Sequence, residues 1–198
     1  MTIIAGLGVD PGWRWTAGVL VVNGEPVDGF TLGPTDADGQ PFRAAHDDMD
    51  PAATRRYCDR IGAHLDRLYD DCVDRYGILP LVGVEIPTMP LRAKNTGQYI
   101  ARMRAFRITE NVGYYVLGHY AVVEAFRFTA EHPHGKRHLA EHGGTGKLFD
   151  HYPKDLCWRR PADWLVNEEP DTSRDHERSA FDVAVRRVEM AQSMLVAA

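Results

Sequence analysis

Five side chains able to bind metal or transfer protons stand where the pattern of the chain changes. Asp10 and Glu85 each end an apolar run, and Asp175, His176 and Asp182 stand near the start of the last helical pattern. Hard divalent cations such as Mg²⁺ take several oxygen ligands, and two ions about 4 Å apart need carboxylates that bridge them. These residues are a ligand set for divalent metal, provided that the fold brings them together.

Each carboxylate also has an ordinary structural interpretation. An Asp before Pro-Gly is a common turn former, which applies to Asp10, and a Glu before Pro is often exposed, which applies to Glu85. Asp175 can cap the last helix or interact with its dipole. The metal interpretation depends on all three places carrying an acidic residue at once.

The elements that would position these residues follow from the hydrophobic pattern. Apolar runs at 2–9, 15–22 and 27–32 predict three strands, and Asn23-Gly24 between the last two is a strong hairpin signal. Apolar residues at three- and four-residue spacing predict helices over 51–77, over 93–117 and from 173 almost to the end. Two short apolar runs, 78–86 and 121–126, predict strands between them, and the polar segments 33–50 and 132–147 predict loops.

The resulting order, β-β-β-α-β-α-β-α, predicts an α/β protein with the ribonuclease H-like fold. That fold is a mixed five-stranded sheet flanked by helices on both faces, and we expect one domain over residues 1–198. Its first and fourth strands are neighbours near the centre of the sheet, and the last helix crosses them. Asp10, Glu85 and the acidic start of the last helix would therefore converge.

The composition is that of an ordinary soluble chain. It has 198 residues, of which 44% are hydrophobic and 26% charged. No run reaches the roughly 20 apolar residues of a membrane span, and the start lacks a signal-peptide profile, so we expect a cytoplasmic protein with no membrane partner. The three cysteines lie far apart, which excludes a disulfide framework and a cysteine zinc site.

The charge is unevenly distributed. The formal net charge is -5, yet residues 92–160 hold twelve Lys and Arg against six Asp and Glu, together with six of the nine histidines. Charge fluctuates along any chain, and such a block can be no more than a solvated face. Its functional interpretation is a local phosphate-binding surface on an otherwise acidic protein.

Several motifs also carry a family resemblance. The segment 8–18, Gly-Val-Asp-Pro-Gly-Trp-Arg-Trp-Thr-Ala-Gly, resembles the first-strand motif of RuvC-type Holliday-junction resolvases. Val84-Glu85 resembles the second acidic position of that family, and Ala93-Lys94-Asn95 resembles the segment that follows it. The segment 176–184, His-Glu-Arg-Ser-Ala-Phe-Asp-Val-Ala, is similar to the closing helix motif, especially in resolvase-like proteins of some bacteriophages.

The closing motif departs from the family pattern, which is an acidic residue or histidine, two residues, and then Asp-Ala. In one register His176 takes the first place and Ser179 takes the place of the aspartate. In the other register Asp182 takes the aspartate's place and Ser179 the first place. Asp175, His176 and Asp182 all remain candidates for the third position of the metal site. Of the three, we expect Asp182 to be indispensable.

The resemblance implies hydrolysis of a DNA phosphodiester with two Mg²⁺ or Mn²⁺ ions, by a homodimer acting on branched DNA. Asp10 would bridge the ions, Glu85 and Asp182 would each complete a coordination shell, and His176 would position the water or act as general base. Met89 or Leu91 stands where the family inserts an apolar side chain into the junction. Packing in the core or a dimer contact explains an apolar residue at this place equally well. The residues expected to contact DNA are Arg14, Met89, Arg92, Lys94, Arg102, Arg104, Arg107, Lys136, Arg137 and Lys147.

Other functions fit parts of the same pattern. A protein that keeps the fold and binds junctions without cutting is supported by Ser179, and another nuclease of the same fold would differ only in substrate. The two-lobed sugar kinases and actin-like ATPases need well over 300 residues. The segment 142–147, His-Gly-Gly-Thr-Gly-Lys, lacks the first Gly and the final Ser or Thr of a Walker loop, so we expect no nucleotide cofactor.

Overall fold

The computed structural model describes residues 3–36, 38–39, 50–87, 96–132, 136–139, 152–153, 156, 158 and 170–197. Six strands form a sheet in the order β3-β2-β1-β4-β5-β6. The strands are β1 (Ala5–Asp10), β2 (Thr16–Val22), β3 (Glu25–Leu32), β4 (Leu81–Ile86), β5 (Val123–His132) and β6 (Lys136–Leu139). The helices are α1 (Pro51–Tyr76), α2 (Thr96–His119) and α3 (Pro170–Ala197).

The first three strands form the predicted antiparallel meander. Asn23 and Gly24 both have positive φ angles, 51° and 90°, which is the backbone of the two-residue hairpin turn between β2 and β3. β1 pairs antiparallel with β2 on one side and parallel with β4 on the other, and β4 pairs parallel with β5. This strand order and direction confirm the ribonuclease H-like fold.

One expected loop contains a strand instead. The polar segment 132–147 was predicted to lack regular structure, but residues 136–139 form β6, and β5 continues to His132 to pair with it. The sequence Lys-Arg-His-Leu shows no apolar alternation because an edge strand pairs through its backbone and commonly carries charged residues. The remainder of that segment lies outside the described residues, as does most of the expected loop at 33–50.

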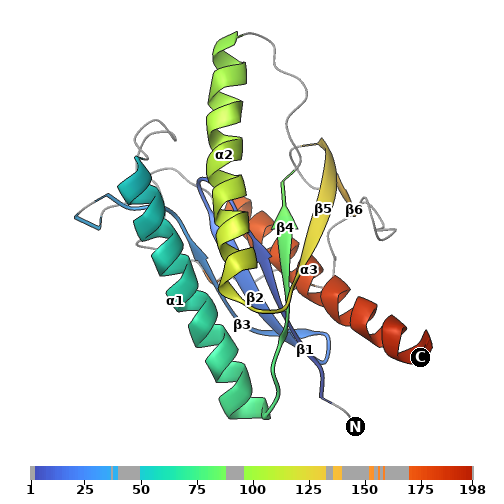
Figure 1. The fold of residues 1–198 in the computed structure, drawn as a ribbon. Coiled ribbons are helices and arrows are strands. Elements are labelled where there is room, and N and C mark those ends of the chain that lie inside the picture. Colours follow the sequence, from blue (N-terminus) through green and yellow to red (C-terminus); the bar gives the residue numbers. More distant parts are fainter. Residues whose placement is uncertain are drawn as a thin grey trace.

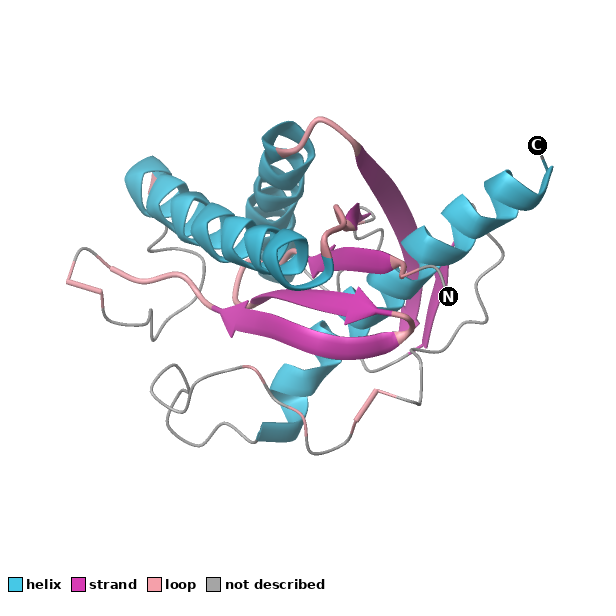
Figure 2. Ribbon diagram, turned by 90° about the horizontal axis from the view of Figure 1, so that it is seen from below, coloured by secondary structure: helices cyan, strands magenta, loops and turns pink. Residues whose placement is uncertain are grey.

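Helices cover both faces of the sheet (Figures 1 and 2). α1 and α2 lie on one face and α3 crosses the other, where it contacts β1, β2 and β4. α1 begins as predicted, with Pro51 in its first turn and the Asp50 side chain accepting a hydrogen bond from the amide of Ala53, and it ends at Gly77. None of the helices in the described ranges combines the length and the apolar character that a membrane crossing requires.

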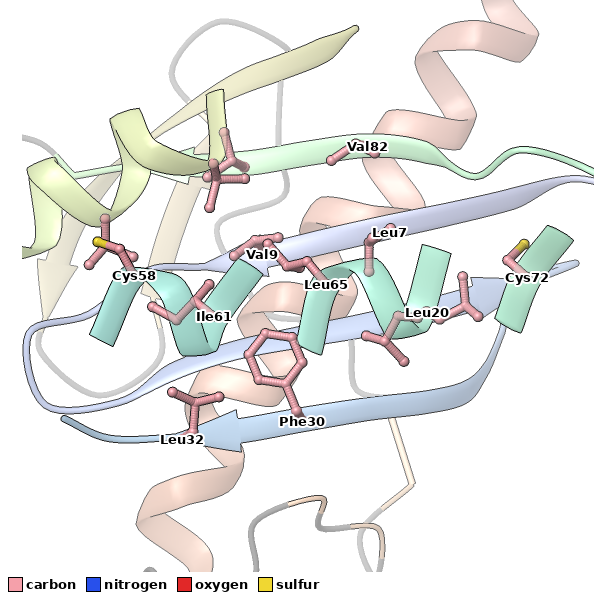
Figure 3. Packing of buried hydrophobic residues seen from close by; sticks show 14 of the residues in the cluster. Leu7, Val9, Leu20, Phe30, Leu32, Cys58, Ile61, Leu65, Cys72 and Val82 are labelled. Carbon is pink, nitrogen blue, oxygen red and sulfur yellow. The ribbon is translucent and has the colours of Figure 1, made fainter. Parts of the chain in front are cut away.

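The main hydrophobic core lies between α1 and the sheet (Figure 3). Ile61 and Leu65 of α1 are fully buried against Leu7 and Val9 of β1. Because side chains alternate along a strand, burial of Leu7 and Val9 under α1 turns Gly6, Gly8 and Asp10 to the α3 face. The core thereby fixes which face of the sheet carries Asp10.

On that opposite face, α3 packs against β1 through glycines. A Cβ atom added at Gly8 would lie 1.9 Å from the carbonyl oxygen of Ala180, and one added at Gly6 would lie 2.6 Å from that of Ala184. Only glycine permits this approach of helix backbone to strand. The α3 residue one turn before Ala180 is His176, which therefore lies over the end of β1.

Candidate active site

Asp10 and Glu85 lie side by side at the carboxyl ends of neighbouring parallel strands. The parallel ladder pairs Val9 of β1 with Val84 of β4, so the next residue on each strand is Asp10 and Glu85. Both are buried, with 3% and 9% of their surface exposed. Strands in a sheet are about 4.8 Å apart, and two charged carboxylates at that spacing repel. Such a pair costs folding free energy unless a cation, a proton or hydrogen-bond donors offset the repulsion.

α3 supplies a partner for each of these two carboxylates. His176 Nδ1 lies 3.1 Å from Asp10 Oδ2, and Ser179 Oγ donates a hydrogen bond of 2.7 Å to Glu85 Oε2. Ser179 is fully buried, whereas 29% of the His176 side chain is exposed. The structure therefore places His176 against Asp10 and Ser179 against Glu85.

The other two candidate residues on α3 are Asp182 and Asp175. Asp182 is buried, with 5% of its surface exposed, and it lies one turn beyond Ser179 and about 9 Å along the helix axis from His176. Asp175 belongs to α3, but its side chain lies outside the described part of the structure. Of the two possible registers of the closing motif, the one with His176 first and Ser179 in the aspartate's place faces the two strand carboxylates.

The donor set suits a hard divalent cation, but with fewer ligands than the sequence predicted. Among the described residues no three His, Cys, Asp or Glu side chains form a group that could hold a metal ion. Mg²⁺ in nucleotide-processing sites is commonly bound through one or two carboxylates, with water and substrate phosphates completing its octahedron. Asp10 and Glu85 fit that role.

A buried hydrogen-bond network holds the turn that follows Asp10. The hydroxyl of Tyr57, on α1, lies 2.8 Å from Thr16 Oγ1 and 3.1 Å from the carbonyl oxygens of Gly12 and Leu32. The amide of Gly12 donates to Thr16 Oγ1 at 3.1 Å. Burial raises the pKa of Tyr57 well above its ordinary value, so the phenol stays protonated. The network fixes the chain immediately after Asp10.

Another carboxylate, Glu177, is completely buried on the same helix as Asp182. Its Oε1 accepts hydrogen bonds from the hydroxyl of Thr31 at 2.7 Å and the amide of Trp158 at 2.9 Å, and its Oε2 accepts one from the hydroxyl of Tyr152 at 2.9 Å. The ring of Tyr152 also packs on Phe181. Glu177 thus connects β3, Tyr152 and Trp158 to α3.

The sequence did not single out Glu177 or Tyr57 for these roles. The available signal for Glu177 was its position four residues before Phe181, on the apolar stripe of the last helix, where a charged side chain requires partners. Tyr57 appeared only as a member of the apolar stripe of α1. Its hydroxyl partners come from segments 25 to 45 residues away, so no local pattern could have identified them.

The predicted DNA contacts are placed only in part. Arg14 is exposed in the turn after β1, and Arg102, Arg104 and Arg107 are exposed on α2. The first turns of α2, which carry these arginines, extend beyond the ends of β1 and β4 on the side where Asp10 and Glu85 lie (Figure 1). Lys136 and Arg137 lie on β6, without described side chains, and Met89, Arg92, Lys94 and Lys147 lie outside the described residues.

Comparison with known proteins shows a distant structural similarity. No protein-family model matches the sequence, and no curated protein matches it as a relative. Among solved structures, the chain is similar to T. thermophilus RuvC in complex with a Holliday junction substrate, with a TM-score of 0.39 and 14% sequence identity. The match covers 91% of this chain and 90% of that chain.

Proposed function

We propose that this protein is a metal-dependent endodeoxyribonuclease that cuts four-way or other branched DNA junctions. The observation that carries the proposal is the buried pair Asp10 and Glu85 at the ends of two neighbouring parallel strands, with His176 against Asp10. A fold retains two adjacent like charges at a cost, and binding a cation is a common reason for keeping them. The sequence resemblance of the segment 8–18 to RuvC-type resolvases supports the same reaction.

Asp10 and Glu85 are the residues that would hold the Mg²⁺ or Mn²⁺. A bound divalent cation lowers the pKa of a water ligand and stabilises charge on a phosphoryl oxygen. His176, partly exposed beside Asp10, is the group within reach to orient the attacking water or accept its proton. The resemblance implies two ions, with Asp182 as a further ligand and Asp175 as an alternative.

DNA would bind over the edge of the sheet where the carboxylates lie. Arg14 and the three arginines of α2 are exposed at that edge and would neutralise phosphates, which positions the DNA without reading its sequence. Binding of this kind weakens steeply as salt increases. The fixed position of the arginines relative to Asp10 would decide which phosphate reaches the metal.

We further propose a homodimer, because paired cuts in a four-way junction require two active sites. The first three turns of α2 contain no buried residue, and they expose Tyr99 and Ile100. Apolar side chains on a helix end that extends from the fold are typical of a surface that another chain covers. Sedimentation equilibrium across a range of protein concentrations tests the association.

A second candidate function is junction binding without cleavage. The observation that favours it is Ser179, which contacts Glu85 from the place where the family motif has an aspartate. A serine hydroxyl is a weak ligand for Mg²⁺ compared with a carboxylate. In this case the arginines would still bind branched DNA, but no metal would promote hydrolysis.

One cleavage assay separates these functions. The wild-type protein is incubated with a synthetic four-way junction, a linear duplex and an RNA–DNA hybrid, each with Mg²⁺, with Mn²⁺ and with chelator, and the Asp10→Asn variant serves as the matched control. Symmetric metal-dependent nicking of the junction alone, lost in the variant, supports the resolvase. Cleavage of the hybrid indicates another nuclease of this fold, and binding without cleavage under every metal condition indicates the non-catalytic protein.

A further inference from the structure

Ser179 is the residue on α3 that contacts Glu85. Its hydroxyl is fully buried and donates a 2.7 Å hydrogen bond to Glu85 Oε2. One turn away on the same helix, His176 contacts Oδ2 of Asp10. Each strand carboxylate therefore has one oxygen engaged by α3, in both cases by a side chain without negative charge of its own.

This arrangement changes the charge available for cations. A carboxylate in place of Ser179 would add a third acidic group beside Asp10 and Glu85, whereas the hydroxyl adds no negative charge. Two ions about 4 Å apart need bridging carboxylates and enough negative charge to offset their mutual repulsion.

We propose that Ser179 is a positioning residue for Glu85, and that the protein without DNA binds one divalent ion per chain, held by Asp10 and Glu85. The inference rests on the proposed function and specifies its metal requirement. The Ser179 hydroxyl holds the Glu85 carboxylate in one orientation, and partners of this kind fix metal-binding side chains for their role. Any second ion would enter only with the phosphate oxygens of the DNA.

Titration of the full chain with Mn²⁺, without DNA, tests the proposal by calorimetry and by the paramagnetic resonance of free Mn²⁺. We expect one ion per wild-type chain and no binding at this site in Asp10→Asn. Ser179→Ala should bind Mn²⁺ roughly tenfold more weakly, which is a typical loss for a residue that orients a ligand. Ser179→Asp should bind a second ion, because it adds the missing carboxylate.

Two control variants separate positioning from general damage. Ser193→Ala removes an exposed hydroxyl of α3 that bonds to the backbone of Glu189, and it should leave Mn²⁺ affinity unchanged. Leu65→Ala destabilises the core on the other face of the sheet, and at a temperature where it is folded it should bind Mn²⁺ as the wild type does. An equal loss of affinity in Leu65→Ala and Ser179→Ala would contradict the positioning role.

The remaining outcomes distinguish this inference from the proposed function. The inference would be overturned by two Mn²⁺ ions per wild-type chain, or by unchanged or tighter Mn²⁺ binding in Ser179→Ala. Neither result would contradict metal-dependent cleavage, which the junction assay measures separately. No Mn²⁺ binding by the wild type, together with no cleavage of the junction, would overturn both. Because the wild-type stoichiometry needs no substitution, the test stands even if Ser179→Asp fails to fold.

Discussion

The α3 side of the sheet buries carboxylates of two kinds. Glu177 accepts hydrogen bonds from Thr31, Tyr152 and the amide of Trp158, which come from separate segments of the chain. Asp10 and Glu85 instead lie next to each other at the strand ends, where α3 contributes His176 to Asp10 and Ser179 to Glu85. Glu177 is enclosed by donors, whereas Asp10 and Glu85 place two like charges together.

The difference teaches how to separate structural from functional buried charge. A buried carboxylate that receives several hydrogen bonds contributes to holding the fold, because its removal leaves those donors without an acceptor. Two adjacent carboxylates oppose folding, so their value must come from something that binds there. Substitutions at the two places should consequently have opposite effects on stability and on activity.

The largest expected effect is on activity. Asp10→Asn should reduce junction cleavage by about a thousandfold, the scale on which loss of a key electrostatic group acts. The same change should leave the unfolding midpoint without metal unchanged or higher, because it removes one of two neighbouring charges. Single-turnover cleavage and urea unfolding are the measurements, and a normal cleavage rate would exclude Asp10 from the metal site.

Glu177 should show the reverse pattern. Glu177→Ala leaves three donors without their acceptor, two of them buried, and should cost roughly 3 kcal/mol of unfolding free energy. The control Glu189→Ala breaks a partly exposed ion pair with Arg186 on the same helix and should cost about 1 kcal/mol. Urea denaturation of both variants measures the loss of unfolding free energy. Equal losses in the two variants would contradict the structural role assigned to Glu177.

Divalent metal should stabilise the protein through the strand pair. At ten times its dissociation constant, Mn²⁺ should raise the melting temperature by about 3 to 6 °C, because a ligand that binds only the folded state shifts the equilibrium by mass action. Glu85→Gln should show a much smaller rise, and Glu189→Ala should respond as the wild type does. A full rise in Glu85→Gln would place the metal elsewhere.

The smallest expected effect concerns the network behind Asp10. Tyr57→Phe removes the hydroxyl that contacts Thr16 and the carbonyl oxygens of Gly12 and Leu32, and should cost about 1 kcal/mol of unfolding free energy. Junction cleavage should fall severalfold, because the turn after Asp10 is held less firmly. Unfolding and cleavage are to be measured on the same preparations. A loss of stability without any loss of cleavage rate would contradict the link between this network and Asp10.

The same residue gives a pH dependence. Burial raises the pKa of Tyr57 in the folded state, so the neutral phenol is favoured by folding. The stability that this contributes is complete below the pKa of an unfolded tyrosine, about 10, and is lost as the pH rises above it. Wild-type stability should therefore decline more steeply than that of Tyr57→Phe above pH 10, as measured by urea midpoints at successive pH values.

The sequence was informative where a local pattern determines the structure. Asn23-Gly24, Pro51 and Gly77 mark turns and helix ends through their own backbone preferences, and the structure has each in its predicted role. β6 was missed because an edge strand needs no apolar alternation. Its pairing with β5 comes from backbone hydrogen bonds, which the side chains of residues 136–139 do not reveal.

The candidate site was predictable in its strand half and less so in its helix half. Asp10 and Glu85 follow from strand order, because parallel neighbours end at the same edge. The choice among Asp175, His176 and Asp182 depends on how α3 is rotated about its axis, and that rotation is set by packing on Gly6 and Gly8. Sequence spacing gives the period of a helix, but not which of its sides meets the sheet.

The glycine contacts between β1 and α3 make the alignment of the site sensitive to changes far from it. A single methyl group at Gly6 would have to move the backbone of α3 near Ala184, and the helix would carry His176 and Ser179 with it. Substitutions that leave every carboxylate in place could thus abolish the activity while the protein still folds. In a screen of random variants, these two small residues would be as intolerant of replacement as Asp10 itself.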